Sequence, residues 1–160
     1  MAGFIDILKE ADSINIIRSC DNWQEAIRKC FEPLLKKKYI SCGYIEKSIT
    51  TGKELNFHYI LGKGLAMPHA KRNFGVFKTG LSMLIIKNGV KFENHLNNTV
   101  YCLIGVAAAD NDSHIEIMSD VLEIFGSDDD GVVVNNIRFF DEKEDIIKYL
   151  SDKKFNLNKI

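Results

Sequence analysis

A histidine directly after a proline is the residue of this chain that is best suited to chemistry. His69 lies in the segment GKGLAMPHA at residues 62–70. Pro68 has a fixed φ and restrains the residue before it, and the small residues around the histidine leave room for the backbone of another molecule. An imidazole held by one nitrogen keeps the other free as a nucleophile. Taken alone, His69 also fits a turn histidine that only hydrogen-bonds a carbonyl.

A second histidine, His114, stands just inside an expected helix start. Asp112 or Ser113 is a suitable N-cap, and apolar residues follow at helical spacing up to a stop at Gly126. The N–H groups and the dipole at a helix start favour an anion such as phosphate, to which a histidine can donate a hydrogen bond. If it stood alone, His114 would be better interpreted as a polar first-turn residue that faces water.

Together these segments resemble a known family. The pattern G-x-A-x-P-H-A at 64–70, the segment KTGLS at 78–82 and the pattern D-N-x-S-H-I-E at 110–116 are similar to the enzyme IIA domain of the bacterial sugar phosphotransferase system (PTS). Within it, the chain resembles the fructose/mannitol superfamily and looks closest to its ascorbate-type branch. The resemblance covers about residues 22–150.

This resemblance implies a phosphotransferase that carries phosphate on a histidine during sugar uptake, with ascorbate as the sugar that the branch suggests. By the same resemblance, His69 matches the histidine that is transiently phosphorylated, and His114 matches the second active-site histidine. The phosphate would come from the carrier protein HPr and pass to enzyme IIB, with the membrane permease IIC as an indirect partner. We expect no cofactor and no metal, because the phosphoryl group of the donor is already activated. A homodimer is left open.

Two further residues are candidates for phosphate binding. Lys53 stands where the mannitol-like branch has an arginine, and it keeps the charge but not the planar fork of that side chain. The ascorbate-type branch does not keep that arginine, so Lys53 also fits that branch with no role. Ser113, next to His114, is a weaker candidate for donating a hydrogen bond to the phosphate. Lys71 and Arg72 fit a solvated face, and we do not expect them in the site.

Other chemistries fit the sequence less well. Neither GKG nor GKE has the spacing of a P-loop, so direct use of ATP is not expected. A metal-dependent hydrolase would need ligand spacing that the four histidines, His58, His69, His95 and His114, do not follow, and His58 and His95 fall outside the matched pattern. A Cys–His hydrolase would need an accessible thiol, and the cysteines lie in apolar contexts. A regulatory IIA-like module, in which phosphorylation controls a partner, remains the main alternative.

Composition is consistent with a cytoplasmic protein. With 160 residues, the chain is predicted to form one domain over 1–160. Its formal net charge of −1 gives no reason to expect nucleic acid as a partner. The N-terminus lacks the pattern of a signal peptide, and the apolar run at 100–109 is too short to span a bilayer.

The elements that would position the two histidines alternate along the chain. Strands that lie between helical segments predict an α/β fold, a three-layer sandwich with a mixed sheet flanked by helices on both faces, as the family resemblance also implies. Strands are predicted at 59–61, 65–67, 79–87 and 99–108, and helices from Asn22 through Leu35, near 41–51, at 114–125, around 129–137 and at 142–150.

Overall fold

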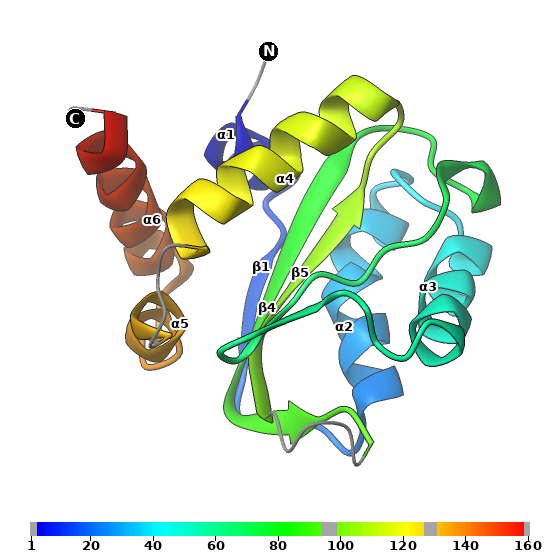
Figure 1. Cartoon of the computed structure of the whole chain (residues 1–160), viewed down its shortest axis with the longest axis horizontal. Helices are drawn as coiled ribbons and strands as arrows, with labels where there is room; N and C mark the ends of the chain where they lie inside the picture. The colour runs from blue at the N-terminus through cyan, green and yellow to red at the C-terminus, as the bar shows by residue number, and fades with distance from the viewer. Residues whose placement is uncertain (1–2, 94–98, 127–130, 159–160) are drawn as a thin grey trace.

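The computed structural model describes residues 3–93, 99–126 and 131–158, which form a mixed sheet covered by helices (Figure 1). The strand order is β1-β4-β5-β3-β2; β1 pairs with β4 and β3 pairs with β5 in parallel, and the other two pairs are antiparallel. The strands span Ile14–Ile17 (β1), Ile60–Gly62 (β2), Leu65–Ala66 (β3), Gly80–Lys91 (β4) and Thr99–Ala107 (β5).

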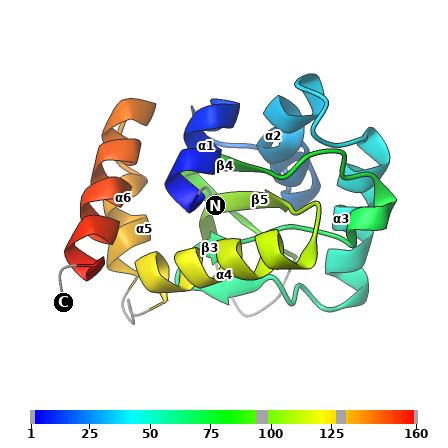
Figure 2. The same ribbon diagram turned by 90° about the horizontal axis from the view of Figure 1, so that it is seen from above.

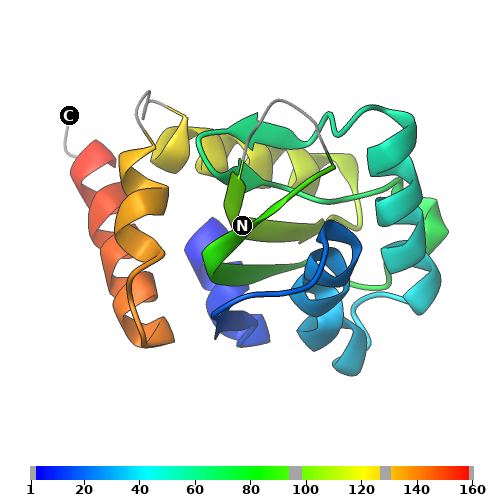
Figure 3. The same cartoon turned by 90° about the horizontal axis from the view of Figure 1, so that it is seen from below.

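Helices cover both faces of this sheet, as the sequence predicts. Figures 2 and 3 show α2 and α3 on one side of the strands and α1, α5 and α6 on the other. No helix in the described part of the chain is both long and apolar enough to cross a membrane. The helices are α1 (Phe4–Ala11), α2 (Trp23–Lys36), α3 (Cys42–Glu54), the short 3-10 helix η1 (Arg72–Phe74), α4 (Asn111–Phe125), α5 (Val132–Ile137) and α6 (Lys143–Asn158).

The central strands have apolar side chains on both faces, which gives the molecule two hydrophobic cores. In β4, Leu84 and Ile86 pack in the core under α2 and α3, whereas Met83 and Ile85 pack in the core under α1, α4, α5 and α6. Because successive side chains of a strand point to opposite faces, a strand buried on both faces appears as a continuous apolar run. This is why the sequence alone identifies β4 and β5.

The first two elements were not anticipated from the sequence. Helix α1 buries Phe4 and Leu8, and β1 adds a parallel edge strand to β4, with Ile14 opposite Met83. At the other end of the chain, α6 continues to Asn158, beyond the predicted end at 150. Helix α5 begins at Val132, and positions 129 and 130 of the predicted helix lie outside the described residues.

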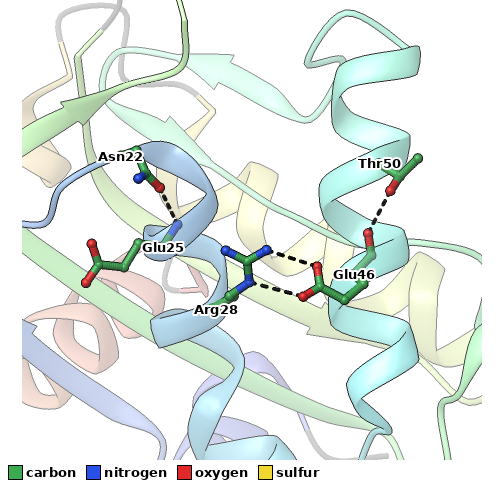
Figure 4. Close-up of polar contacts among 5 residues, drawn as sticks. All are labelled: Asn22, Glu25, Arg28, Glu46 and Thr50. Carbon is green, nitrogen blue, oxygen red and sulfur yellow. Dashed lines mark hydrogen bonds and ion pairs between the residues drawn. The ribbon is translucent and has the colours of Figure 1, made fainter.

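Helices α2 and α3 are joined at the surface by an ion pair. Arg28 donates two hydrogen bonds to Glu46, from Nε to Oε1 at 3.1 Å and from Nη2 to Oε2 at 3.2 Å (Figure 4). Asn22 caps α2 by accepting a hydrogen bond from the backbone N–H of Glu25 at 2.8 Å (Figure 4). The ion pair is exposed to solvent and lies away from the C-terminal end of α3, which leads to the site.

Candidate functional site

His69 follows β3, and the hydrogen bond of its ring determines which nitrogen is free. Its Nδ1 lies 2.8 Å from the backbone oxygen of Met67. Because a carbonyl oxygen only accepts hydrogen bonds, Nδ1 carries the proton and Nε2 of the neutral ring keeps its lone pair. The side chain is half-buried and therefore reachable from solvent. His69 thus has the form that nucleophilic attack requires.

The backbone around His69 is held at three points. Pro68 accepts a hydrogen bond from the N–H of Val106 at 3.1 Å, and the N–H of Met67 donates to the oxygen of Tyr59 at 2.9 Å. The N–H of Ala70 donates to the hydroxyl of Tyr44 at 3.1 Å. These contacts reach β5, the chain before β2 and α3, so the histidine loop is fixed by three separate segments.

The buried tyrosine Tyr44 is the link to α3. Its hydroxyl donates to the backbone oxygen of Val106 at 2.6 Å while it accepts from Ala70. Burial raises the pKa of Tyr44 to about 12, so its hydroxyl stays protonated near neutral pH. The hydroxyl of Tyr44 therefore keeps its hydrogen bond to the backbone oxygen of Val106.

His114 lies next to His69, with ring centroids 5.7 Å apart. It belongs to the first turn of α4, as predicted, but the N-cap is Asp110, neither Asp112 nor Ser113. The carboxylate of Asp110 accepts a hydrogen bond from the N–H of Ser113 at 2.7 Å. The helix therefore starts at Asn111, three residues before His114. The sequence signal was ambiguous because each of the four positions 110–113 holds a residue type that commonly caps helices.

Both histidines line a pocket of about 360 Å³ between α3, the loop after β3 and the start of α4. Lys71 and Arg72 also line it, although the sequence placed them on a solvated face. The guanidinium of Arg72 donates to the amide oxygen of Asn111 at 2.5 Å. No carboxylate belongs to the described residues that line this pocket. Its cations and imidazoles therefore suit an anionic group.

His58 is a pocket residue that the sequence did not identify. Its ring centroid lies 5.4 Å from that of His69, and it lines the same pocket. Partial burial lowers the pKa of His58 and of His114 below the ordinary histidine value, and neighbouring His69 lowers both further. Arg72 adds a smaller lowering effect at His114. Both side chains are therefore mainly neutral at pH 7.

The two weaker candidates from the sequence lie elsewhere. Lys53 forms an ion pair with Glu93 at 3.5 Å and lines a hollow beside Trp23. Ser113 lines a hollow on the α1 side of α4, beside Phe4. Neither is among the residues that line the His69 pocket. His95 lies outside the described residues.

The arrangement does not favour a thiol as the reacting group. Burial raises the pKa of Cys30 to about 12 and raises that of Cys102 as well. No cysteine lines the described part of the His69 pocket. Within the described residues, no group of three or more His, Cys, Asp or Glu side chains is arranged to hold a metal ion.

Comparison with known protein families gives one match that covers most of the chain. The family described as "Phosphoenolpyruvate-dependent sugar phosphotransferase system, EIIA 2" matches residues 7–153. Among curated relatives, the mannitol-specific cryptic phosphotransferase enzyme IIA component of Escherichia coli K12 is 40% identical over 112 residues, which are 70% of this chain and 76% of that protein. The ascorbate-specific PTS system EIIA component of the same strain is 30% identical over 112 residues, 70% of this chain and 73% of that protein.

Solved structures share the fold. The solution structure of the mannitol-specific cryptic enzyme IIA CmtB from Escherichia coli is 31% identical, with a TM-score of 0.74 over 92% of this chain and 97% of that one. Enzyme IIAMTL in its complex with phosphorylated enzyme IIBMTL, also from Escherichia coli, gives a TM-score of 0.73 at 24% identity, over 89% of this chain and 96% of that one.

Proposed function

Because this chain belongs to the EIIA 2 family of the phosphoenolpyruvate-dependent sugar phosphotransferase system, we propose that it carries phosphate on His69 from HPr to enzyme IIB. Enzyme IIA components are phosphotransferases, and the chain is one of them. The observation that carries the assignment of His69 is the hydrogen bond from its Nδ1 to Met67, which leaves Nε2 free at a pocket whose described lining residues include no carboxylate.

The proposed reaction consists of two in-line transfers. In the first, the lone pair of His69 Nε2 attacks the phosphorus of phospho-HPr, an Nε2–P bond forms, and the N–P bond of the donor breaks. In the second, a thiolate of enzyme IIB attacks the same phosphorus and the Nε2–P bond breaks, which restores neutral His69. The bond broken in the first step is already labile, so catalysis consists mainly of positioning and of stabilising the charge on the phosphoryl oxygens.

In this proposal, three side chains of the pocket stabilise that charge. His114 lies beside the His69 ring, and Lys71 and Arg72 add positive charge from the loop that follows it. Arg72 donates a hydrogen bond to Asn111, and its planar guanidinium has further N–H groups that suit phosphoryl oxygens. In this proposal Lys53 and Ser113 have no direct part, because they line other hollows.

Apolar side chains at the rim suit docking of a protein partner. Leu55 lines the pocket and is 55% exposed, and Ile115, directly after His114, is 65% exposed. Exposed apolar side chains around a polar centre are typical of protein-binding surfaces. In a fold neighbour, enzyme IIB is the bound partner. We infer that HPr and enzyme IIB use this rim in turn, in the cytoplasm, and that the permease IIC is reached through enzyme IIB.

Incubation with phosphoenolpyruvate, enzyme I and HPr tests this proposal. The intact protein should gain the mass of one phosphoryl group, which mild acid should remove, as expected for a phosphohistidine. His69→Ala should gain none and should keep its circular dichroism spectrum, because a half-buried loop side chain contributes little to packing. Addition of enzyme IIB should then discharge the labelled wild-type protein.

Two results would contradict the assignment. Label that survives mild acid would mean that another residue type is modified. Phosphorylation of His69→Ala, mapped to His114 or His58, would mean that the nucleophile is misassigned. Charging by HPr without discharge to enzyme IIB would favour the regulatory alternative.

A further inference from the structure

His58 has no role in the relay described above, yet its ring faces the residue that receives the phosphate. The rings of His58 and His69 lie at a centroid distance of 5.4 Å, and those of His69 and His114 at 5.7 Å. The three histidines come from three segments, the turn before β2, the loop after β3 and the start of α4. A phosphoryl group on His69 would therefore have two imidazoles within reach, that of His58 and that of His114.

A strained turn brings His58 to this place. Asn56 and Phe57 both have a φ of 55°, in the left-handed region that residues with a side chain rarely adopt. Phe57 is only 5% exposed, and its ring packs edge-on against Trp23 with centroids 4.9 Å apart. Its N–H donates to the oxygen of Gly52 at 2.6 Å. Strain of this kind persists where the surroundings hold it, and it is common at functional sites.

Tyr59, the residue after His58, is buried and hydrogen-bonded, as Phe57 before it is. Tyr59 is 1% exposed, and its hydroxyl donates to the oxygen of Ser48 at 3.3 Å. Its backbone oxygen accepts the N–H of Met67, the residue that also holds the ring of His69. His58 is thus an exposed side chain between two buried anchors, and its backbone is fixed relative to His69. Groups that are preorganised in this way lose little freedom when a ligand arrives.

We propose that His58 is a phosphate-binding residue that takes up a proton from solvent when His69 is phosphorylated and then donates a hydrogen bond to a phosphoryl oxygen. The inference rests on the proposed function of His69. When the phosphate leaves, the proton returns to solvent, so the step is balanced without another reactant.

The charges around His58 explain why it would change state. The titratable and charged groups that share its pocket are Tyr44, His69, Lys71, Arg72 and His114, with no carboxylate among the described lining residues. In the free protein, partial burial and His69 lower the pKa of His58, so the ring is mainly neutral. An anionic phosphoryl group at His69 would place a negative charge beside the His58 ring, which favours its protonated form.

Nuclear magnetic resonance of the histidine rings tests the proposal directly. The pKa of His58 is measured in free wild-type protein and in protein kept charged by phosphoenolpyruvate, enzyme I and HPr. An opposite charge at this range should raise that pKa by about one unit or more. An unchanged pKa in the charged protein would overturn the proposal.

The pH dependence of the transfer equilibrium provides a second measurement. The equilibrium constant for transfer from phospho-HPr is compared between pH 5.5 and 8.5 for wild type, His58→Phe and His58→Gln. If phosphorylation raises the pKa of His58 by one unit, the advantage of wild type over His58→Phe depends on pH. The ratio of their two equilibrium constants should fall about tenfold as pH rises through the His58 pKa of the free protein and that of the phosphorylated protein. Titration of the donor cancels in this ratio. His58→Gln, which keeps a donor but does not titrate, should have a larger equilibrium constant than His58→Phe while showing the same flattened pH profile.

A matched control removes a positive charge away from the pocket. Arg28→Gln breaks the exposed ion pair with Glu46 (Figure 4) and should leave the wild-type pH profile unchanged. Superimposable profiles of wild type, His58→Phe and His58→Gln would overturn the role of His58 alone, because transfer itself would still occur. A wild-type protein that accepts no phosphate on His69 would overturn the proposed function, and this inference with it.

Discussion

The side chain of His114 differs from that of His69 in its expected role. It lies beside the reacting histidine, in the first turn of a helix, where a hydrogen-bond donor can reach the phosphoryl oxygens. His69 has a partner for Nδ1 and a free Nε2. At this scale we therefore assign attack to His69 and stabilisation of charge to His114.

Replacement of His114 tests that division. His114→Ala should still accept phosphate on His69, but transfer in both directions should slow by about 10²-fold, the lower end of what the loss of one preorganised donor costs. His114→Gln should recover part of the rate because an amide donates the same hydrogen bond. Quench-flow with phospho-HPr as donor and enzyme IIB as acceptor measures both directions. Equal rates in all three proteins would mean that His114 is a surface residue of the helix.

The two histidines with lowered pKa also make stability depend on pH. The pKa of His58 and that of His114 lie below 6.5 in the folded protein. The unfolded chain then binds more protons than the folded one as pH falls below this value, so the free energy of unfolding decreases. Carboxylates with a lowered pKa, such as Asp141, act only below about pH 4. The loss of stability caused by the histidines and the loss caused by the carboxylates therefore occur in different pH ranges.

Thermal melting between pH 7.5 and 5.5 should therefore show a falling Tm in the wild-type protein. The fall should be smaller in the double variant His58→Gln/His114→Gln, which has lost both titrating rings. A Tm that stays constant over this range, or the same fall in the double variant, would contradict the prediction.

At the scale of elements, the start of α4 depends on its cap. Asp110→Ala removes the acceptor for the N–H of Ser113 and should lower the Tm. The first turn should also fray, which moves His114 and slows transfer. Asp110→Asn keeps an acceptor at the same place and should retain most of both properties. Identical melting of Asp110→Ala and wild type would show that the cap does not hold this turn.

The turn that carries His58 depends on a glycine in α3. A Cβ at Gly52 would lie 2.0 Å from the hydroxyl oxygen of Tyr59 and 2.6 Å from the ring carbon that bears it. Gly52→Ala should therefore displace Tyr59 and destabilise the protein by about 1–3 kcal/mol, the usual cost of overpacking.

Gly43 on the same helix is the matched control. Its added Cβ would meet its nearest neighbour at 3.6 Å, so Gly43→Ala should be neutral or stabilising by up to about 1 kcal/mol. Urea denaturation of both variants measures the difference. Equal effects at the two positions would mean that helix propensity, and not contact with Tyr59, decides the outcome.

For the whole molecule, the proposed relay uses a phosphoryl group that is activated before it arrives. HPr that has been charged and then separated from enzyme I should therefore phosphorylate the chain at an unchanged rate in excess EDTA. The measurement is a time course of the mass gain with and without the chelator. A strict requirement for Mg²⁺ in this isolated step would contradict the mechanism.

Local patterns in the sequence are enough to predict several parts of this protein. The segment around Pro68 and His69, the apolar runs of β4 and β5 and the cap of α2 at Asn22 each lie within a few residues. Such short-range patterns can be recognised without knowing which distant residues each segment contacts. The α/β class and the helices on both faces follow from the order of such segments.

Which charged side chains share the pocket of His69 depends on contacts between residues far apart in the sequence. Arg72 pairs with Asn111, 39 residues away, whereas Lys53 turns to Glu93 on another surface. His58 reaches the pocket through a left-handed turn at Phe57, which packing against Trp23 holds in place. Local preference does not predict this turn, because Asn56 tolerates a left-handed φ but Phe57 disfavours it unless distant side chains support it. Long-range packing therefore determines which residues line the pocket.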